Sequence, residues 1–299
     1  MANLKQSDAA AAVPASMAPL SASGTRRNIV LFVAGVTAIA WAANYLANRD
    51  SGVDPAMASV GMSITAMGPI LMAVLLRRLS GHGWGNAGLA LYYRQSKSCY
   101  ALVLVFTPLV ILFIAVLAIS LGVAELAPDP RAAAGSMLQI FGITLGPMLF
   151  LSIGEEFGWR GYLEPELWSI NQRAVLNHVF IGIIWGLWHF PILIFAPDND
   201  ISAAQLAMVL TGSVALAIIY GQMRLRSGSV WPCVILHAVS NAAFVAVGSS
   251  KLLRFDASTK DYISFNSTSL AVVGTWLASA LILLALIKSA PAVFKSSDR

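Results

Sequence analysis

Charged residues are scarce in this chain. Lys, Arg, Asp and Glu together make up 11% of its 299 residues, whereas they make up about 25% of a soluble domain. Hydrophobic residues reach 58%, and the mean hydropathy is +0.74. This balance excludes an ordinary soluble enzyme and predicts a protein that crosses the lipid bilayer several times.

Cysteine is also scarce, since Cys99 and Cys233 are the only two. They form neither a Cys-x-x-Cys motif nor a zinc-finger spacing, so we expect no redox motif and no structural zinc site of that kind. Both fall at segment ends on the side that the charge pattern below makes cytoplasmic. A structural disulfide is therefore not expected.

Apolar runs of membrane-spanning length recur along the chain. About 20 apolar residues cross the hydrocarbon core as a helix, and eight segments qualify. They predict an all-α fold, a polytopic transmembrane helix bundle with about eight spans. The predicted spans are Asn28–Ala47, Ala56–Leu76, Tyr100–Ala124, Ser136–Leu163, Leu176–Phe195, Ser202–Gly221, Ser229–Val247 and Leu270–Ile287.

The Lys and Arg residues between these spans predict the orientation of the bundle. If the N-terminus is inside, fourteen of the 19 basic residues lie on the cytoplasmic side. The positive-inside rule therefore places both the N- and C-termini in the cytoplasm. The net charge of +5 is scattered without a basic stripe, so we expect the lipid bilayer and no nucleic acid as a partner. The five outside residues are Arg49, Arg131, Lys251, Arg254 and Lys260.

One membrane domain accounts for most of the chain. Residues 1–24 are rich in Ala, Ser and Pro without a hydrophobic period, which predicts a disordered N-terminal tail. A transmembrane helical domain is expected over residues 25–290, followed by a C-terminal tail over residues 291–299. No internal repeat stands out, which disfavours a transporter built from inverted halves.

Two adjacent carboxylates, Glu155 and Glu156, follow the apolar run Met137–Ile153. A charge at the bilayer centre costs about 2.5–3.5 kcal/mol on insertion scales, so such groups usually line a cavity or form a site. If the helix continues, Glu156 and Arg160 share a face and are predicted to pair. Glu155 is rotated by about 100° and is expected to face the bundle interior. The alternative is that both are ordinary charges at the membrane boundary.

Two other spans carry polar groups. His189 lies in the fifth span with Trp185 and Trp188, which we expect to form the walls of a pocket. His237 and Asn241 are four residues apart and share one helical face of the seventh span. Each alone is explained by interhelical hydrogen bonding. Together with the carboxylates of the fourth span they favour a buried site that activates water.

These motifs, in this order, resemble those of the CPBP family of intramembrane proteases. That family includes the type 2 CAAX prenyl proteases and the bacterial ABI and lysostaphin-resistance-like proteins. The resemblance covers about residues 136–245, the predicted protease core. The second motif is usually Phe-x-x-x-His, so Trp185 is a departure that keeps an aromatic wall and bears on the pocket's shape. The matching segments are Glu155-Glu156-x-x-x-Arg160, Trp185-x-x-x-His189 and His237-x-x-x-Asn241.

The resemblance implies a hydrolase, a membrane endopeptidase. On the family's pattern Glu155 matches the carboxylate that activates water, and His189 helps to hold that water. His237 and Asn241 match the groups that stabilise the tetrahedral oxyanion. The supporting residues are Glu156, Arg160, Trp185 and Trp188.

The cofactor stays open at this point. Glu155, His189 and His237 supply three ligands for a catalytic zinc ion with one open position, and the family is commonly labelled metalloprotease. The HExxH spacing is absent, however, and a metal-free glutamate mechanism uses the same residues.

The expected substrate is a membrane peptide or a lipid-anchored protein, prenylated or not. The expected location is a bacterial-type inner or plasma membrane, with the active site opening to the cytoplasmic side. Two other functions stay open. One is a non-catalytic scaffold or bacteriocin- or peptide-immunity protein that binds in the same cavity. The other is a small-solute transporter with Glu155 as its coupling carboxylate.

Overall fold

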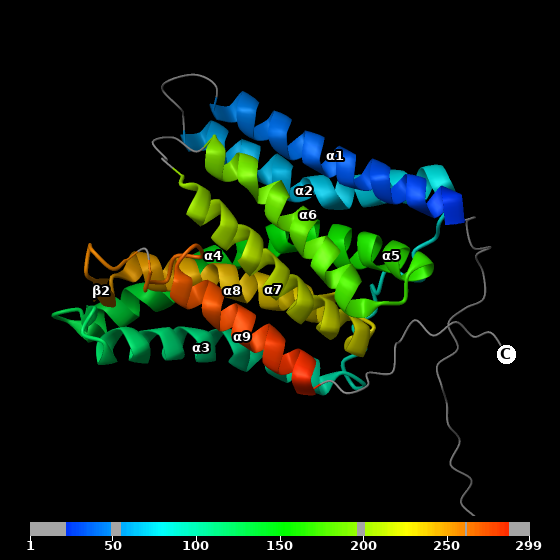
Figure 1. The fold of residues 1–299 in the computed structure, drawn as a ribbon. Coiled ribbons are helices and arrows are strands. Elements are labelled where there is room, and N and C mark those ends of the chain that lie inside the picture. The colour runs from blue at the N-terminus through cyan, green and yellow to red at the C-terminus, as the bar shows by residue number, and fades with distance from the viewer. Residues whose placement is uncertain (1–21, 49–54, 196–200, 261, 287–299) are drawn as a thin grey trace, which may run out of the picture.

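The computed structural model describes residues 22–48, 55–195, 201–260 and 262–286. In lipid each backbone N–H and C=O needs a partner, which a helix supplies from its own segment, and the described chain is helical almost throughout (Figure 1). The elements are α1 (Ala22–Asn48), α2 (Pro55–Ser80), α3 (Lys97–Ser120), β1 (Ala124–Leu126), α4 (Pro130–Gly158), η1 (Trp159–Leu163), α5 (Glu164–Ile170), α6 (Ala174–Ile194), α7 (Ala203–Ser227), α8 (Trp231–Ser250), β2 (Leu253–Phe255) and α9 (Leu270–Leu286).

The predicted membrane bundle is confirmed. Within the described residues, seven helical stretches are long and apolar enough to cross a membrane. The eighth predicted span corresponds to α9, whose 17 described residues are apolar and lie at the lower limit for a span. The chain is therefore a multi-pass integral membrane protein.

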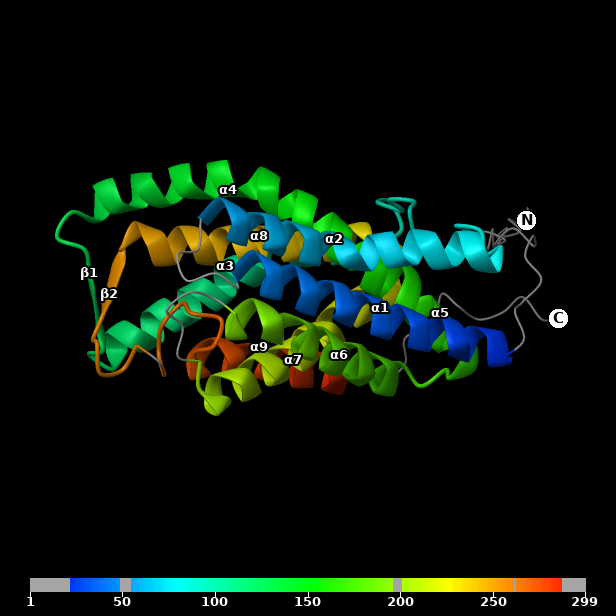
Figure 2. The same cartoon turned by 90° about the horizontal axis from the view of Figure 1, so that it is seen from above.

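The helices run roughly along one direction and pack as two groups (Figures 1 and 2). In the first group, α4 packs between α2 and α8, and α3 lies against α8. In the second, α7 packs between α6 and α9, and α1 joins the groups by contacting both α2 and α6. At one end of the bundle β1 pairs with β2 in antiparallel register, which ties the segment after α3 to the segment after α8.

The boundaries of the predicted domain change slightly at the N-terminus. Helix α1 begins at Ala22, so residues 22–24 belong to a helix and not to the predicted tail. Tertiary packing explains the difference, because Thr25 in this first turn is buried against the bundle. Residues 1–21 and the predicted C-terminal tail lie outside the described residues.

The fourth predicted span is part of a longer helical run, from Pro130 to Ile170. Asp129 caps its start by accepting a hydrogen bond from the backbone N–H of Ala132. In its last third the run passes through one turn of π-helix, η1, of a kind that is frequent at functional sites. The widened turn leaves carbonyl groups that need partners, and two buried arginines supply them. Arg77 Nη2 donates to Gly161 O (2.8 Å), and Arg224 Nε donates to Arg160 O (3.2 Å).

Two glycines let α4 approach α2 closely. A Cβ atom on Gly154 would lie 2.5 Å from the carbonyl oxygen of Ala66, and one on Gly158 would lie 2.7 Å from the carbonyl carbon of Pro69. Small residues spaced in this way allow backbones to touch in membrane helix pairs. The turn that carries the two glutamates is therefore held directly against α2.

Candidate active site

Both carboxylates of the fourth span are buried within the bundle. Glu155 is 7% exposed and Glu156 is fully buried. They are consequently not ordinary charges at the membrane boundary. Their side chains leave α4 in different directions, as the helical rotation of 100° per residue requires, and they meet different partners.

The predicted ion pair between Glu156 and Arg160 is confirmed. Arg160 Nη1 donates to Glu156 Oε1 at 2.9 Å, and both side chains are fully buried. The guanidinium also lies over the rings of Trp185 (4.9 Å) and Tyr220 (5.0 Å). A buried charge needs this kind of enclosure, because an ion without a partner is costly to keep away from water.

Glu156 has a second partner on α8. His237 Nδ1 lies 3.0 Å from the same Oε1 atom. Because an ionised carboxylate only accepts hydrogen bonds, Nδ1 is the protonated nitrogen in this pair. His237 thus uses Nδ1 for Glu156 and keeps Nε2 for another contact. Spacing along the sequence did not predict this bond.

Glu155 and His189 are both tied to Trp185 on α6. The indole Nε1–H of Trp185 donates to Glu155 Oε2 at 2.9 Å. One helical turn later, His189 Nδ1 lies 2.8 Å from the backbone oxygen of Trp185. Since a carbonyl only accepts, this nitrogen carries the proton and leaves Nε2 as the acceptor of a neutral ring.

The four predicted catalytic side chains line one cavity of about 490 Å³, together with the two predicted aromatic walls. Glu155, His189, His237 and Asn241 come to it from α4, α6 and α8, as the sequence predicts. Asn241 lies one turn beyond His237, and among the described residues no side chain or backbone group hydrogen-bonds to its amide.

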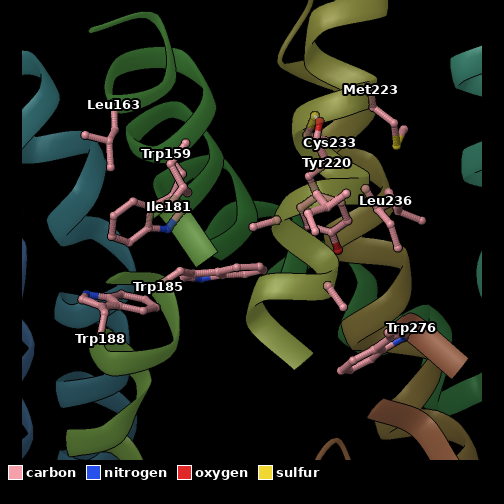
Figure 3. Packing of buried hydrophobic residues seen from close by; sticks show 14 of the residues in the cluster. Trp159, Leu163, Ile181, Trp185, Trp188, Tyr220, Met223, Cys233, Leu236 and Trp276 are labelled. Carbon is pink, nitrogen blue, oxygen red and sulfur yellow. Dashed lines mark hydrogen bonds between the residues drawn. The ribbon is translucent and has the colours of Figure 1, made fainter. Parts of the chain in front are cut away.

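Aromatic rings form much of the cavity's inner surface. Figure 3 shows Trp185 reaching across from the α6 side toward the α7–α8 side, where Tyr220 lies. Trp188 stands edge-on to the ring of His189, with 4.9 Å between ring centroids. The cavity lining confirms the prediction that Trp185 and Trp188 form walls of a pocket.

Two lining residues were missed by sequence reasoning. Tyr220 on α7 lies between Trp185 and His237, with ring centroids 5.9 and 5.8 Å away. Trp276 on α9 closes another side of the cavity. Tyr220 is an isolated polar aromatic in an apolar span, and that was the only signal available. The sequence around Trp276 gave no signal that this residue would line the cavity.

The cavity extends from Glu155 to a segment that follows β2, where Asn266 and Ser267 are both exposed and line it. This end of the bundle carries Arg254, which the charge count assigns to the outside. The lining residues give no support to the cytoplasmic opening expected from that count, which stays a prediction.

A zinc ion does not fit the described side chains as they lie. Among the described residues, no group of three or more His, Cys, Asp or Glu side chains is gathered closely enough to hold a metal. We therefore derive no step through a metal, and the zinc alternative stays an expectation.

Comparison with known proteins agrees with this site. Residues 137–243 match the family model described as type II CAAX prenyl endopeptidase Rce1-like. This match supports the resemblance to the CPBP family that the motifs indicate. The matched segment contains all of the predicted site residues and overlaps the predicted core at residues 136–245.

One curated relative is similar in sequence over a shorter stretch. CAAX prenyl protease 2 of Methanococcus maripaludis is 41% identical over 51 residues. These residues are 16% of this chain and 18% of the relative, so the chain matches less than a fifth of that protein's length.

Proposed function

We propose that this chain is an intramembrane endopeptidase that hydrolyses a peptide bond with water activated by Glu155. One observation carries the proposal: a carboxylate, two imidazoles and an amide from three helices line a single cavity within the bundle. The family assignment supports the same reaction class, since the matching family model is that of an endopeptidase.

Glu155 is suited to act as the general base. Its Oε2 accepts the indole hydrogen bond of Trp185, so Oε1 is the oxygen available to a water molecule. His189 adds an acceptor at Nε2, because its Nδ1 proton is used on the backbone of Trp185. The water oxygen attacks the substrate carbonyl carbon while one water proton passes to Glu155, which later delivers it to the leaving amine.

His237 and Asn241 are suited to stabilise the oxyanion that this attack creates. The Asn241 amide is a donor in every state. His237 donates from Nε2 when its ring carries both protons, since Glu156 occupies Nδ1. Donors held in place within a water-poor site stabilise developing negative charge, and loss of one typically costs about 10²–10³-fold in kcat.

The cavity indicates the class of substrate. Most of its lining is apolar, with side chains such as Leu151, Val209 and Leu216. A membrane peptide or the end of a lipid-anchored protein satisfies such a lining, since apolar walls favour apolar segments. Prenylated and unprenylated substrates both fit this description.

The proposal is tested by cleavage of a membrane-peptide library with purified protein in lipid nanodiscs. Wild type is compared with Glu155→Ala, and each is assayed with and without a chelator. We expect cleavage by wild type and none by Glu155→Ala. Glu125→Ala is the matched control, because Glu125 is an exposed carboxylate on β1 and should keep full activity.

Equal cleavage by wild type and Glu155→Ala would rule out the proposed role of Glu155. If neither protein cleaves any peptide, the scaffold or immunity function gains support. Glu155-dependent solute uptake into proteoliposomes would instead favour the transporter. Chelator-sensitive cleavage that zinc restores would show a metal mechanism.

A further inference from the structure

Trp185 contacts three of the groups to which the proposed function assigns chemistry. Its indole N–H donates to Glu155 at 2.9 Å, and its backbone oxygen accepts from His189 at 2.8 Å. Its ring meets the imidazole of His237 edge to face, with centroids 5.5 Å apart at 74°. Of these contacts, only the indole bond to Glu155 needs a donor that a purely apolar wall lacks.

The hydrogen bond to Glu155 is the informative one. Among the described residues, no other donor reaches either oxygen of Glu155, so the indole alone determines how that carboxylate is turned. The donor and acceptor are both buried, and hydrogen bonds to charged groups are stronger than those between neutral groups.

The direction of this N–H is itself restricted. The Arg160 guanidinium lies over the Trp185 ring, and the ring of Tyr220 packs beside it. Figure 3 shows the indole lying between the α4–η1 side and the α7–α8 side of the site. Packing of this kind holds a side chain in one rotamer, which is the condition for a donor to position its acceptor.

We propose that Trp185 is a positioning residue whose indole N–H holds Oε2 of Glu155 and thereby presents Oε1 to the attacking water. This inference rests on the proposed function, because it presupposes that Glu155 is the general base of that reaction. The positioning role requires a hydrogen-bond donor at position 185, which a wall of the cavity does not require. A phenylalanine ring fills the same side of the cavity but donates no hydrogen bond.

The first test is a comparison of Trp185→Phe with wild type in the cleavage assay. Loss of a hydrogen bond to a charged group predicts a fall in kcat of about tenfold to a hundredfold, with KM within about twofold. Trp159→Phe is the matched control. Trp159 is also buried, its Nε1 has no hydrogen-bond partner among the described residues, and it does not line the cavity. We expect its kcat to stay within about twofold of wild type.

A second variant separates the lost donor from altered packing. Replacement of Trp185 by β-(3-benzothienyl)alanine keeps the bicyclic shape and substitutes sulfur for the N–H group. We expect the same fall in kcat as for Trp185→Phe. A kcat within about twofold of wild type in this variant would overturn the positioning role, whatever Trp185→Phe shows.

The hydrogen bond is also measured without any activity. Protein labelled with ¹⁵N at the indole nitrogens gives one N–H resonance for each tryptophan, and the resonance of Trp185 is the one missing from Trp185→Phe. We expect Glu155→Ala to shift this resonance and to leave that of Trp159 in place. If wild type cleaves nothing but the shift is seen, the proposed function fails while the contact stands. If the Trp185 resonance does not move, the positioning proposal fails.

Discussion

Glu156 and His237 are joined by a hydrogen bond of 3.0 Å between Oε1 and Nδ1, although they lie on α4 and α8. The same oxygen accepts from Arg160 at 2.9 Å. The second glutamate of the pair is therefore a buried link between the two helices. It orients the imidazole that the proposed function places at the oxyanion.

Removal of the cation from this link should destabilise the fold. Arg160→Met leaves the carboxylate of Glu156 buried without its charge partner, and breaking a buried pair typically costs about 3–5 kcal/mol. We expect a clear fall in the unfolding temperature, measured by intrinsic fluorescence in detergent micelles. Arg254→Met is the control, because its pair with Glu125 is exposed and should be worth less than about 1 kcal/mol. Similar losses in both variants would contradict this account.

Loss of the imidazole at position 189 should reduce catalysis without unfolding the bundle. His189→Ala removes the Nε2 acceptor assigned to the water, and groups in such roles contribute about 10²–10⁴-fold. We expect kcat to fall within this range at an unchanged unfolding temperature. His82→Ala is the matched control, since His82 pairs with Glu166 and does not line the cavity. Its cleavage rate should equal that of wild type.

The close contact between α4 and α2 predicts that a larger residue at Gly158 lowers the stability of the protein. Gly158→Ala places a Cβ atom within 2.8 Å of the Pro69 backbone, so the helices must separate. Overpacking of this kind typically costs about 1–3 kcal/mol. Gly146→Ala on the same helix has nothing within 4 Å of its new Cβ atom and should be neutral or stabilising. Thermal unfolding of the two variants measures the difference, and equal stabilities would refute the packing argument.

Filling the cavity should weaken substrate binding. Val209→Phe adds volume to the cavity of about 490 Å³ that contains Glu155, and we expect KM to rise at least about tenfold, or about 1.4 kcal/mol. Ala115→Phe is the control. It fills a separate apolar cavity of about 400 Å³ between α3, α4 and α8, which none of the proposed catalytic residues lines. Steady-state kinetics with one peptide substrate should separate the two variants, and an unchanged KM in Val209→Phe would place the substrate elsewhere.

Much of the site was visible in the sequence because buried polar groups are rare in membrane helices. Glu155, His189 and His237 stood out against apolar surroundings, and helical periodicity correctly paired Glu156 with Arg160. Each of these inferences needs only one helix, or the contrast between one residue and its neighbours.

Other features depend on contacts between distant segments. The bond between His237 and Glu156 joins residues 81 positions apart, and that between Trp185 and Glu155 joins residues 30 positions apart. Tyr220 also lines the cavity, although it lies on α7, a helix in which the sequence showed no motif. The start of α1 at Ala22 likewise goes with the burial of Thr25 in its first turn and not with local composition.

The sequence by itself determined that the protein is a bundle of membrane helices and which polar side chains its interior must accommodate, because the cost of placing charge in lipid is a property of each residue. Only the tertiary structure decided which atom each of these groups contacts. Hydrogen bonds between helices depend on helix spacing, rotation and rotamers, and the periodicity of a single helix contains none of these.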